Sequence, residues 1–100
     1  MALEIRESRG LFEVLGNVSS QNLGALNIYF ETVLEANDHM VVSLEGVTEM
    51  DASGALFFEQ LYKNGAQRNK VVSIVGKQNR DIAQIMDMTN TDYILSSDRV

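Results

Sequence analysis

Apolar and polar residues follow two different periods along the chain, and these periods predict its strands and helices. Residues 3–7 alternate between apolar and polar side chains, as a half-buried strand does, and residues 11–15 form a second apolar-rich run. The turn residues Ser8, Arg9 and Gly10 lie between the two runs. The chain is therefore expected to begin with a hairpin.

A helix is expected over residues 21–36, because apolar side chains recur there at helical spacing and form one buried stripe. Ser19 or Ser20 would cap its N-terminus, and Asn37 with Asp38 would end it. Ile28 points away from the stripe, which indicates either a scattered surface residue or a second contact surface. The stripe itself consists of Leu23, Leu26, Phe30, Val33 and Leu34.

Two short runs rich in β-branched residues, 39–44 and 71–75, are typical of buried strands. A loop, VTEMDASG, is expected after the first run, followed by a helix that extends to about residue 68. Gly76 would end the second run. In each case a strand is followed by a helical segment, which favours parallel strands joined by right-handed crossovers.

The last part of the chain predicts one more helix and one more strand. Asn79 would cap a third helix, and residues 93–95 would form a short final strand. The tail SSDRV is expected to be frayed. Ile82, Ile85 and Met86 share a face of this helix. The predicted order ββαβαβαβ gives a single α/β domain over residues 1–100, with a mixed sheet whose antiparallel edge is the opening hairpin.

Composition and charge exclude several classes of function. The net charge is −6, and the 8 Lys and Arg residues are scattered, so no basic face is available for nucleic acid or an anionic membrane. The absence of cysteine excludes disulfides and thiolate metal sites. The N-terminus lacks the apolar core of a signal peptide, and no apolar run has the length of a membrane span. A cytoplasmic location is therefore expected, without membrane insertion.

The segment VTEMDASG holds the main candidate chemistry, because sites in such sheets collect where parallel strands lead into helices. Asp51 or Ser53 could cap the helix, a purely structural role that contributes about 1 kcal/mol. On a helical wheel, however, Ser53 lies outside the core face, and Leu56 lies in the middle of the polar face. The core face consists of Gly54, Phe58, Leu61 and Gly65, with Phe57 and Tyr62 at its flanks.

An accessible hydroxyl beside an exposed leucine suggests a phosphorylation switch. The free N–H groups and the positive end of the helix dipole at the first turn would tolerate a phosphate on Ser53. The phosphate would add about two negative charges next to Asp51, and a partner bound against Leu56 would be repelled.

These residues resemble the STAS domain, the fold of anti-sigma factor antagonists and of the cytosolic ends of sulfate transporters. The resemblance rests on MVVSLEGVTEMDASGALFF, on IMDMTNTDYIL and on the order of elements over nearly the whole chain. In antagonists the loop reads Asp-Ser-Ser/Thr-Gly, and the hydroxyl residue before the glycine is phosphorylated. The resemblance therefore implies that Ser53 is the acceptor and Asp51 the motif acid. Ala52 replaces the first hydroxyl residue, and Ala55-Leu56 replaces the Leu-Gly that often follows Gly54.

The resemblance implies a binding protein and not an enzyme. Its partners would be a kinase-type anti-sigma factor, which phosphorylates Ser53, and a phosphatase that resets the switch. Asp51, Ala52, Gly54, Leu56 and Phe57 would form the surface that meets the partner. The alternative is an accessory subunit of a transporter or signalling assembly, which acts by binding without phosphorylation.

Other sites are disfavoured by the residues. His39 is the only histidine and would lie at the far end of its strand from Ser53, so neither a metal site nor a Ser–His–acid triad is expected. Lys77 follows Gly76, but the earlier glycine and the hydroxyl residue of a P-loop are missing. Met86 and Met88 are interpreted as core and rim. No cofactor is predicted.

Overall fold

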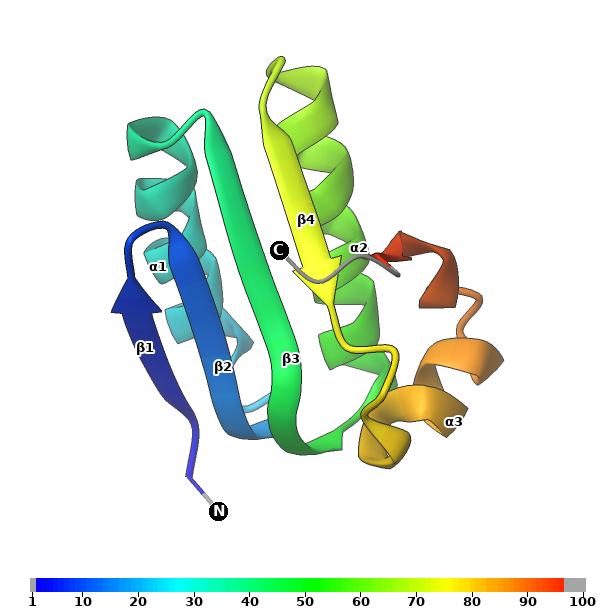
Figure 1. The fold of residues 1–100 in the computed structure, drawn as a ribbon. Helices are drawn as coiled ribbons and strands as arrows, with labels where there is room; N and C mark the ends of the chain where they lie inside the picture. The colour runs from blue at the N-terminus through cyan, green and yellow to red at the C-terminus, as the bar shows by residue number, and fades with distance from the viewer. Residues whose placement is uncertain (1, 97–100) are drawn as a thin grey trace.

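A computed structural model describes residues 2–96 as a five-stranded sheet with its helices on one side (Figure 1). The elements in chain order are β1 (Glu4–Ser8), β2 (Leu11–Val18), α1 (Leu23–Ala36), β3 (His39–Met50), α2 (Ala52–Gln67), β4 (Val71–Val75), α3 (Arg80–Met88), a 3-10 turn η1 (Asp92–Ile94) and β5 (Leu95–Ser96). This order confirms the predicted α/β architecture.

The sheet has the strand order β1-β2-β3-β4-β5. β1 and β2 are antiparallel, and the turn between them uses positive φ angles at Arg9 and Gly10, 51° and 83°. All later strands run parallel, because each is reached by a helical crossover. The opening hairpin therefore forms the antiparallel edge of a mixed sheet, as the sequence predicted.

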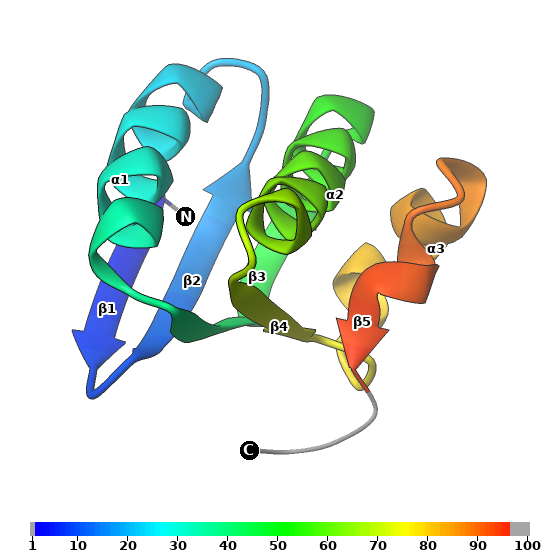
Figure 2. The ribbon, with the colours of Figure 1, turned by 90° about the horizontal axis from the view of Figure 1, so that it is seen from above.

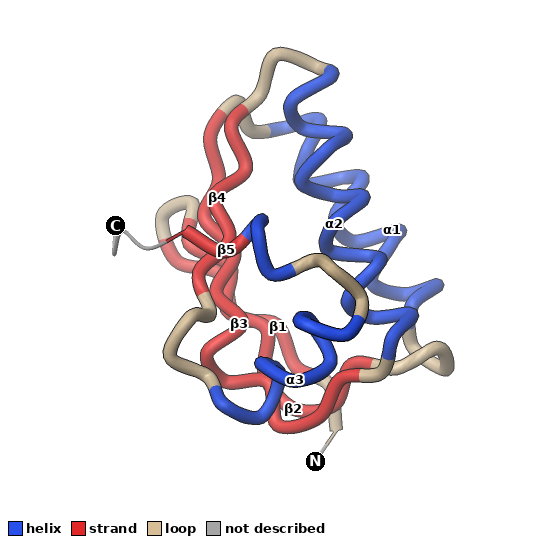
Figure 3. Tube along the Cα trace, turned by 90° about the vertical axis from the view of Figure 1, so that its right-hand side faces the viewer, coloured by secondary structure: helices blue, strands red, loops and turns tan. Residues whose placement is uncertain are grey.

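Helices α1 and α2 lie side by side against one face of the sheet, and α3 lies at its β5 end (Figures 2 and 3). Phe30 of α1 and Phe58 of α2 meet edge to face, with ring centroids 6.4 Å apart. The core between helices and sheet is built from alternate residues of β2, β3 and β4 and from one stripe of each helix. Among residues 2–96, no helix is long and apolar enough to cross a bilayer.

Several sequence predictions differ from the structure. Ser19 and Ser20 do not cap α1: its N-cap is Asn22, because Ser19 Oγ accepts from the Gln21 backbone N–H and forms a turn before the helix. Residues 93 and 94 belong to η1, so the final strand is only Leu95–Ser96. Ser96 of the tail expected to be frayed lies in this strand, and residues 97–100 lie outside the described residues.

A further difference concerns VTEM, which was expected to be a loop and is part of strand β3. β3 continues to Met50 because β2 extends to Val18 and pairs with it along that length. The pairing shifts register between Glu13 and Leu15, and Leu15 then lies opposite Gly46, where an added Cβ would clash with the Leu15 side chain. A long-range strand partner thus overrides the turn signal of glycine and polar residues.

Candidate functional site

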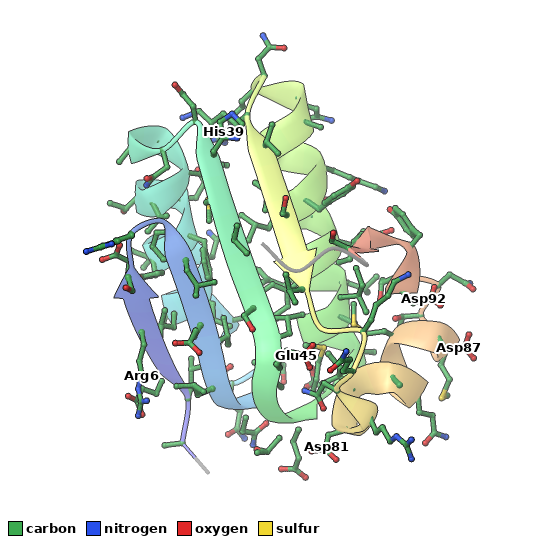
Figure 4. All side chains as sticks on the ribbon, viewed as in Figure 1. Arg6, His39, Glu45, Asp81, Asp87 and Asp92 are labelled. Atoms are coloured by element: carbon green, nitrogen blue, oxygen red, sulfur yellow. The ribbon has the colours of Figure 1, made fainter. Side chains whose placement is uncertain are left out.

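The candidate site lies where β3 ends and α2 begins, with only Asp51 between the two elements. This is the edge of the sheet formed by the C-terminal ends of the parallel strands, the place where sites of open α/β sheets collect. His39 lies at the opposite end of β3 from Asp81, which marks the site end (Figure 4). His39 and Ser53 therefore lie at opposite ends of β3.

Asp51 fixes the junction through both carboxylate oxygens. It is the N-cap of α2, and its Oδ1 accepts a hydrogen bond from the Gly54 backbone N–H at 2.9 Å. Its Oδ2 accepts from the Ser20 N–H at 3.0 Å, and the Asp51 N–H donates to the Val18 carbonyl at 3.2 Å. One side chain therefore joins the first turn of α2 to the segment that follows β2.

Gly54 allows α2 to begin close against the sheet. A Cβ at this position would lie 2.9 Å from Val18 Cγ1, 3.0 Å from Met50 Cγ and 3.2 Å from the Val18 carbonyl oxygen. Cβ atoms essentially never approach another heavy atom to less than 3.0 Å, and the Val18 carbonyl oxygen, as a backbone atom, cannot rotate away. A side chain at this position would force Val18 or the start of α2 to shift, so the motif glycine lets the helix begin close to β2.

Ser53 takes no part in this framework. It occupies the first turn of α2 and is exposed, as is Ala52 beside it. Its hydroxyl forms no hydrogen bond with any of residues 2–96. Because Asp51 supplies the cap, the hydroxyl of Ser53 remains available to solvent.

The two apolar residues of the predicted partner surface differ in burial. Leu56 is 50% exposed, and it lies three residues after Ser53, which places the two on neighbouring parts of the helix surface. Phe57 is half-buried: its ring lies 5.1 Å from that of Phe58 and 6.2 Å from that of Phe30. Leu56 is free to contact another molecule, whereas Phe57 belongs mainly to the edge of the core.

The sequence did not indicate an acidic hollow of about 270 Å³ beside Asp51. Asp81 of α3 and Glu49 of β3 contribute carboxylates to it, although they are far apart in sequence. Its lining consists of Asn17, Ser19, Thr48, Glu49, Met50, Asp51 and Asp81. Within the described residues, no group of three or more His, Asp or Glu side chains is arranged to hold a metal ion.

Asn79 was predicted only as a helix cap, and it has a second role. Its Oδ1 accepts from the Asp81 N–H at 2.9 Å, which confirms the cap. Its Nδ2 also donates to the carbonyls of Leu44 and Val47, at 2.7 and 2.8 Å. β4 no longer pairs with β3 here, so the buried amide satisfies the β3 backbone in its place. Asn79 thereby links α3 to the strand that carries the site.

The whole chain was compared with family profiles. The profile of the STAS domain matches residues 1–98. The chain belongs to the STAS family. No curated protein sequence matches it at a significant level.

Solved structures share the STAS fold with this chain at low sequence identity. An anti-sigma factor antagonist from Mycobacterium paratuberculosis superposes with a TM-score of 0.74 at 14% identity, over 94% of this chain and 81% of its own. The antagonist SpoIIAA in its unphosphorylated form gives 0.72 at 10% identity, over 95% and 86%. The STAS domain of a SulP transporter from Vibrio cholerae gives 0.57 at 17%, over 91% and 72%.

Proposed function

We propose that this STAS protein is a phosphorylation-switched binding protein of the anti-sigma factor antagonist type. Without phosphate it binds a kinase-type anti-sigma factor, which frees a sigma factor for transcription. The kinase then transfers a phosphoryl group to Ser53 and the complex dissociates, and a phosphatase restores the first state. The structural similarity to two anti-sigma factor antagonists supports this proposal at the level of the fold.

The observation that carries the proposal is the division of roles between Asp51 and Ser53. A serine that capped α2 would have its hydroxyl engaged by a backbone N–H. Here the Asp51 carboxylate accepts that bond, and the Ser53 hydroxyl is exposed and unbonded within the described residues. The structural role and the acceptor role therefore fall on different residues.

The chain would be the substrate of the transfer. The Ser53 oxygen attacks the γ-phosphorus of ATP, the bond to the leaving ADP breaks, and the hydroxyl proton passes to a base. The kinase supplies the base, the Mg²⁺ and the phosphate contacts, as kinases do in general. Accessibility and a fixed position of the hydroxyl are what the substrate has to provide, and the Asp51 clamp and Gly54 provide the fixed position.

The switch would act at the surface of α2. A phosphate on Ser53 brings a charge of about −1.5 to −2 to the first helical turn, where the N-terminal dipole favours it. The same charge lies one turn from Leu56 and two residues after the Asp51 carboxylate. A partner that covers Leu56 would have to desolvate the phosphate, which costs more than burying a hydroxyl.

An accessory role in a transporter or signalling assembly is the alternative. It is supported by the similarity to the STAS domain of a SulP transporter. In that case the same α2 surface, with Leu56 at its centre, would bind its partner permanently, and Ser53 would serve only as an interface residue. The two proposals share the surface and differ in whether the phosphate is ever attached.

Phosphopeptide mass spectrometry distinguishes them. The protein is incubated with ATP and lysate of its native cells, and Ser53→Ala and Ser20→Ala are treated in parallel. Ser20 is the matched control, since it is an exposed serine at the same end of the molecule. We expect phosphate on wild type and on Ser20→Ala, and none on Ser53→Ala. An unmodified wild type that still captures transporter components would favour the accessory role, and label remaining on Ser53→Ala would exclude the assignment.

A further inference from the structure

β1 is an edge strand with a long unpaired side. The sheet ends at β1, whose residues Glu4–Ser8 pair with β2 over their full length and with no other described strand. The edge at the opposite end is the two-residue strand β5. An unpaired edge presents backbone N–H and C=O groups to which a further strand can be added. β1 offers five residues for such pairing.

The charges on β1 are arranged in a self-complementary way. Glu4 and Arg6 are exposed on the face away from the helices, and Arg6 Nε lies 2.8 Å from Glu4 Oε2. Figure 4 shows Arg6 on the outer side of β1. Ile5 lies between them on the helix side of the sheet, because it pairs with the buried Val14. The edge therefore reads acid, apolar, base along the strand.

A second copy of β1 can meet this edge only in certain registers. Two identical strands that pair antiparallel are related by a two-fold axis perpendicular to the sheet, so one residue lies opposite its own copy. Placing Glu4 or Arg6 opposite itself brings like charges together. When Ile5 lies opposite Ile5 of the second copy, Glu4 of each copy lies opposite Arg6 of the other, which makes two pairs of opposite charge. Opposite charges across strands stabilise pairing and like charges weaken it, so the charges select the register centred on Ile5.

An apolar stripe on α1 borders the same edge. Ile28 is 71% exposed, the most exposed large apolar side chain among the described residues. Tyr29 connects the stripe to β1: its ring packs on Phe12, and its pKa is raised, first by burial and then by the nearby charge of Glu7. The stripe lines a shallow hollow of about 510 Å³ formed by Ala25, Ile28, Tyr29, Thr32 and Val33.

The same two-fold axis would bring the two stripes together. An axis perpendicular to the sheet keeps both helix layers on one side, and α1 is the helix at the β1 end of that layer (Figure 2). The half-buried Leu3 and Ile5, which pack against the core, lie at the same edge. Edge pairing and burial of the α1 stripe are thus compatible with one arrangement.

We propose that the β1 edge and the α1 stripe form a homodimer interface, in which β1 pairs antiparallel with β1 of a second copy in the register centred on Ile5. The two sheets become one continuous sheet, and the α1 helices pack against each other across the axis. This interface is separate from the Ser53 surface and does not depend on the proposed phosphorylation.

Charge reversal at the edge tests the register. Sedimentation velocity of the full chain at low ionic strength should show a monomer–dimer equilibrium. Arg6→Glu alone or Glu4→Arg alone places like charges opposite each other and should weaken the dimer at least about tenfold. The double variant Glu4→Arg/Arg6→Glu restores opposite charges in both cross-strand pairs and should restore the dimer. Arg80→Glu, the same change at an exposed position on α3, is the matched control and should leave it intact.

A second variant tests the helix part of the interface. Ile28→Lys should weaken the dimer while its thermal midpoint, measured on the monomer at high dilution, stays close to that of wild type, since the side chain is exposed. Circular dichroism of each variant shows that it is folded. A wild type that stays monomeric at its highest soluble concentration would overturn the proposal. A dimer that survives both single charge reversals would place the interface elsewhere.

Discussion

Helices α1 and α2 occupy equivalent places in the fold, yet their N-termini are built differently. Each follows a strand at the same edge of the sheet and covers the same face, and each buries a stripe of the common core. The start of α2 is capped by the Asp51 carboxylate, and Gly54 brings it against Val18 and Met50. The start of α1 has no side-chain cap, and Gly24 has nothing within 4 Å of its missing Cβ.

The difference between the two N-termini separates what a helix needs in order to pack in this fold from the additional contacts made at the candidate site. Asn22, the N-cap of α1, uses its side chain to join Ser19 and Asn17 in the preceding loop, and the helix forms without a cap bond because its apolar stripe is buried. Burial of a stripe therefore suffices to hold a helix in this position. The clamp at α2 goes beyond that requirement, and its effect is to hold the backbone of Ser53 in one place.

The largest contrast is expected within α2, between Phe58 and Leu56. Phe58 is fully buried, so Phe58→Ala should destabilise the protein by about 3–5 kcal/mol. Leu56 is half exposed, so Leu56→Ala and Leu56→Lys should lower stability by only a few tenths of a kcal/mol. Urea denaturation with a far-UV signal gives both values.

Binding should show the reverse order. An apolar anchor in an interface can contribute more than about 2 kcal/mol, so Leu56→Lys should bind the partner at least about tenfold more weakly while remaining folded. Phe58→Ala should lose affinity only to the extent that it unfolds. If Leu56→Lys proved strongly destabilising and Phe58→Ala did not, the surface assigned to α2 would be wrong.

Gly54 of α2 and Gly24 of α1 should give a smaller difference in stability, which compares the two helices directly. Gly54→Ala places a Cβ against the Val18 carbonyl oxygen and should destabilise by about 1–3 kcal/mol. Gly24→Ala meets open space, and alanine is the better helix former, so stability should stay equal or rise by up to about 1 kcal/mol. Denaturant midpoints of the two variants measure the difference. Equal effects would show that α2 is not held more closely to the sheet than α1.

Local signals predicted most of this architecture. The helical period placed Phe58 and Leu61 in the core and Leu56 on the surface, and the residue types at the junction narrowed the cap to Asp51 or Ser53, of which the structure uses Asp51. β4 has the predicted bounds because its five apolar-rich residues are enclosed by Asn69 and Gly76, which end it on both sides. In these places residue type and spacing determine the structure without help from distant contacts.

The features that escaped prediction depend on long-range contacts. β3 extends through Gly46 because β2 pairs with it there, and no local property of EGVTEM indicates that partner. The acidic hollow combines Glu49 and Asp51 with Asp81 of α3, and Asn79 reaches carbonyls 32 and 35 residues away. η1 takes the place of the first two residues of the expected final strand, and its Tyr93 hydroxyl donates to Glu59 on α2 at 2.6 Å. These contacts join residues that are far apart in sequence, so the local pattern of residues does not indicate them.

The smallest effect on stability is expected for a substitution of Ser53. This substitution tests most directly whether the cap and the phosphate acceptor are separate residues. Ser53→Asp introduces one negative charge at an exposed position of the first turn, where the helix dipole favours it. The change removes no hydrogen bond, since the Ser53 hydroxyl makes none with residues 2–96, and the Asp51 clamp uses other atoms. The thermal midpoint should therefore stay within a few degrees of wild type, in line with about ±0.5 kcal/mol.

Ser53→Asp should nevertheless lower the affinity for the partner that binds the unphosphorylated protein. The new carboxylate lies one turn from Leu56 and must be desolvated in the complex. Ser53→Asn is the control, because asparagine has the size of aspartate without its charge. This variant should retain most of the binding. Calorimetric titration at low and high salt separates the causes: a loss due to charge should shrink as salt screens it. If Ser53→Asp melted far below wild type, the first turn of α2 would be a structural element, and the separation of clamp and acceptor between Asp51 and Ser53 would not hold.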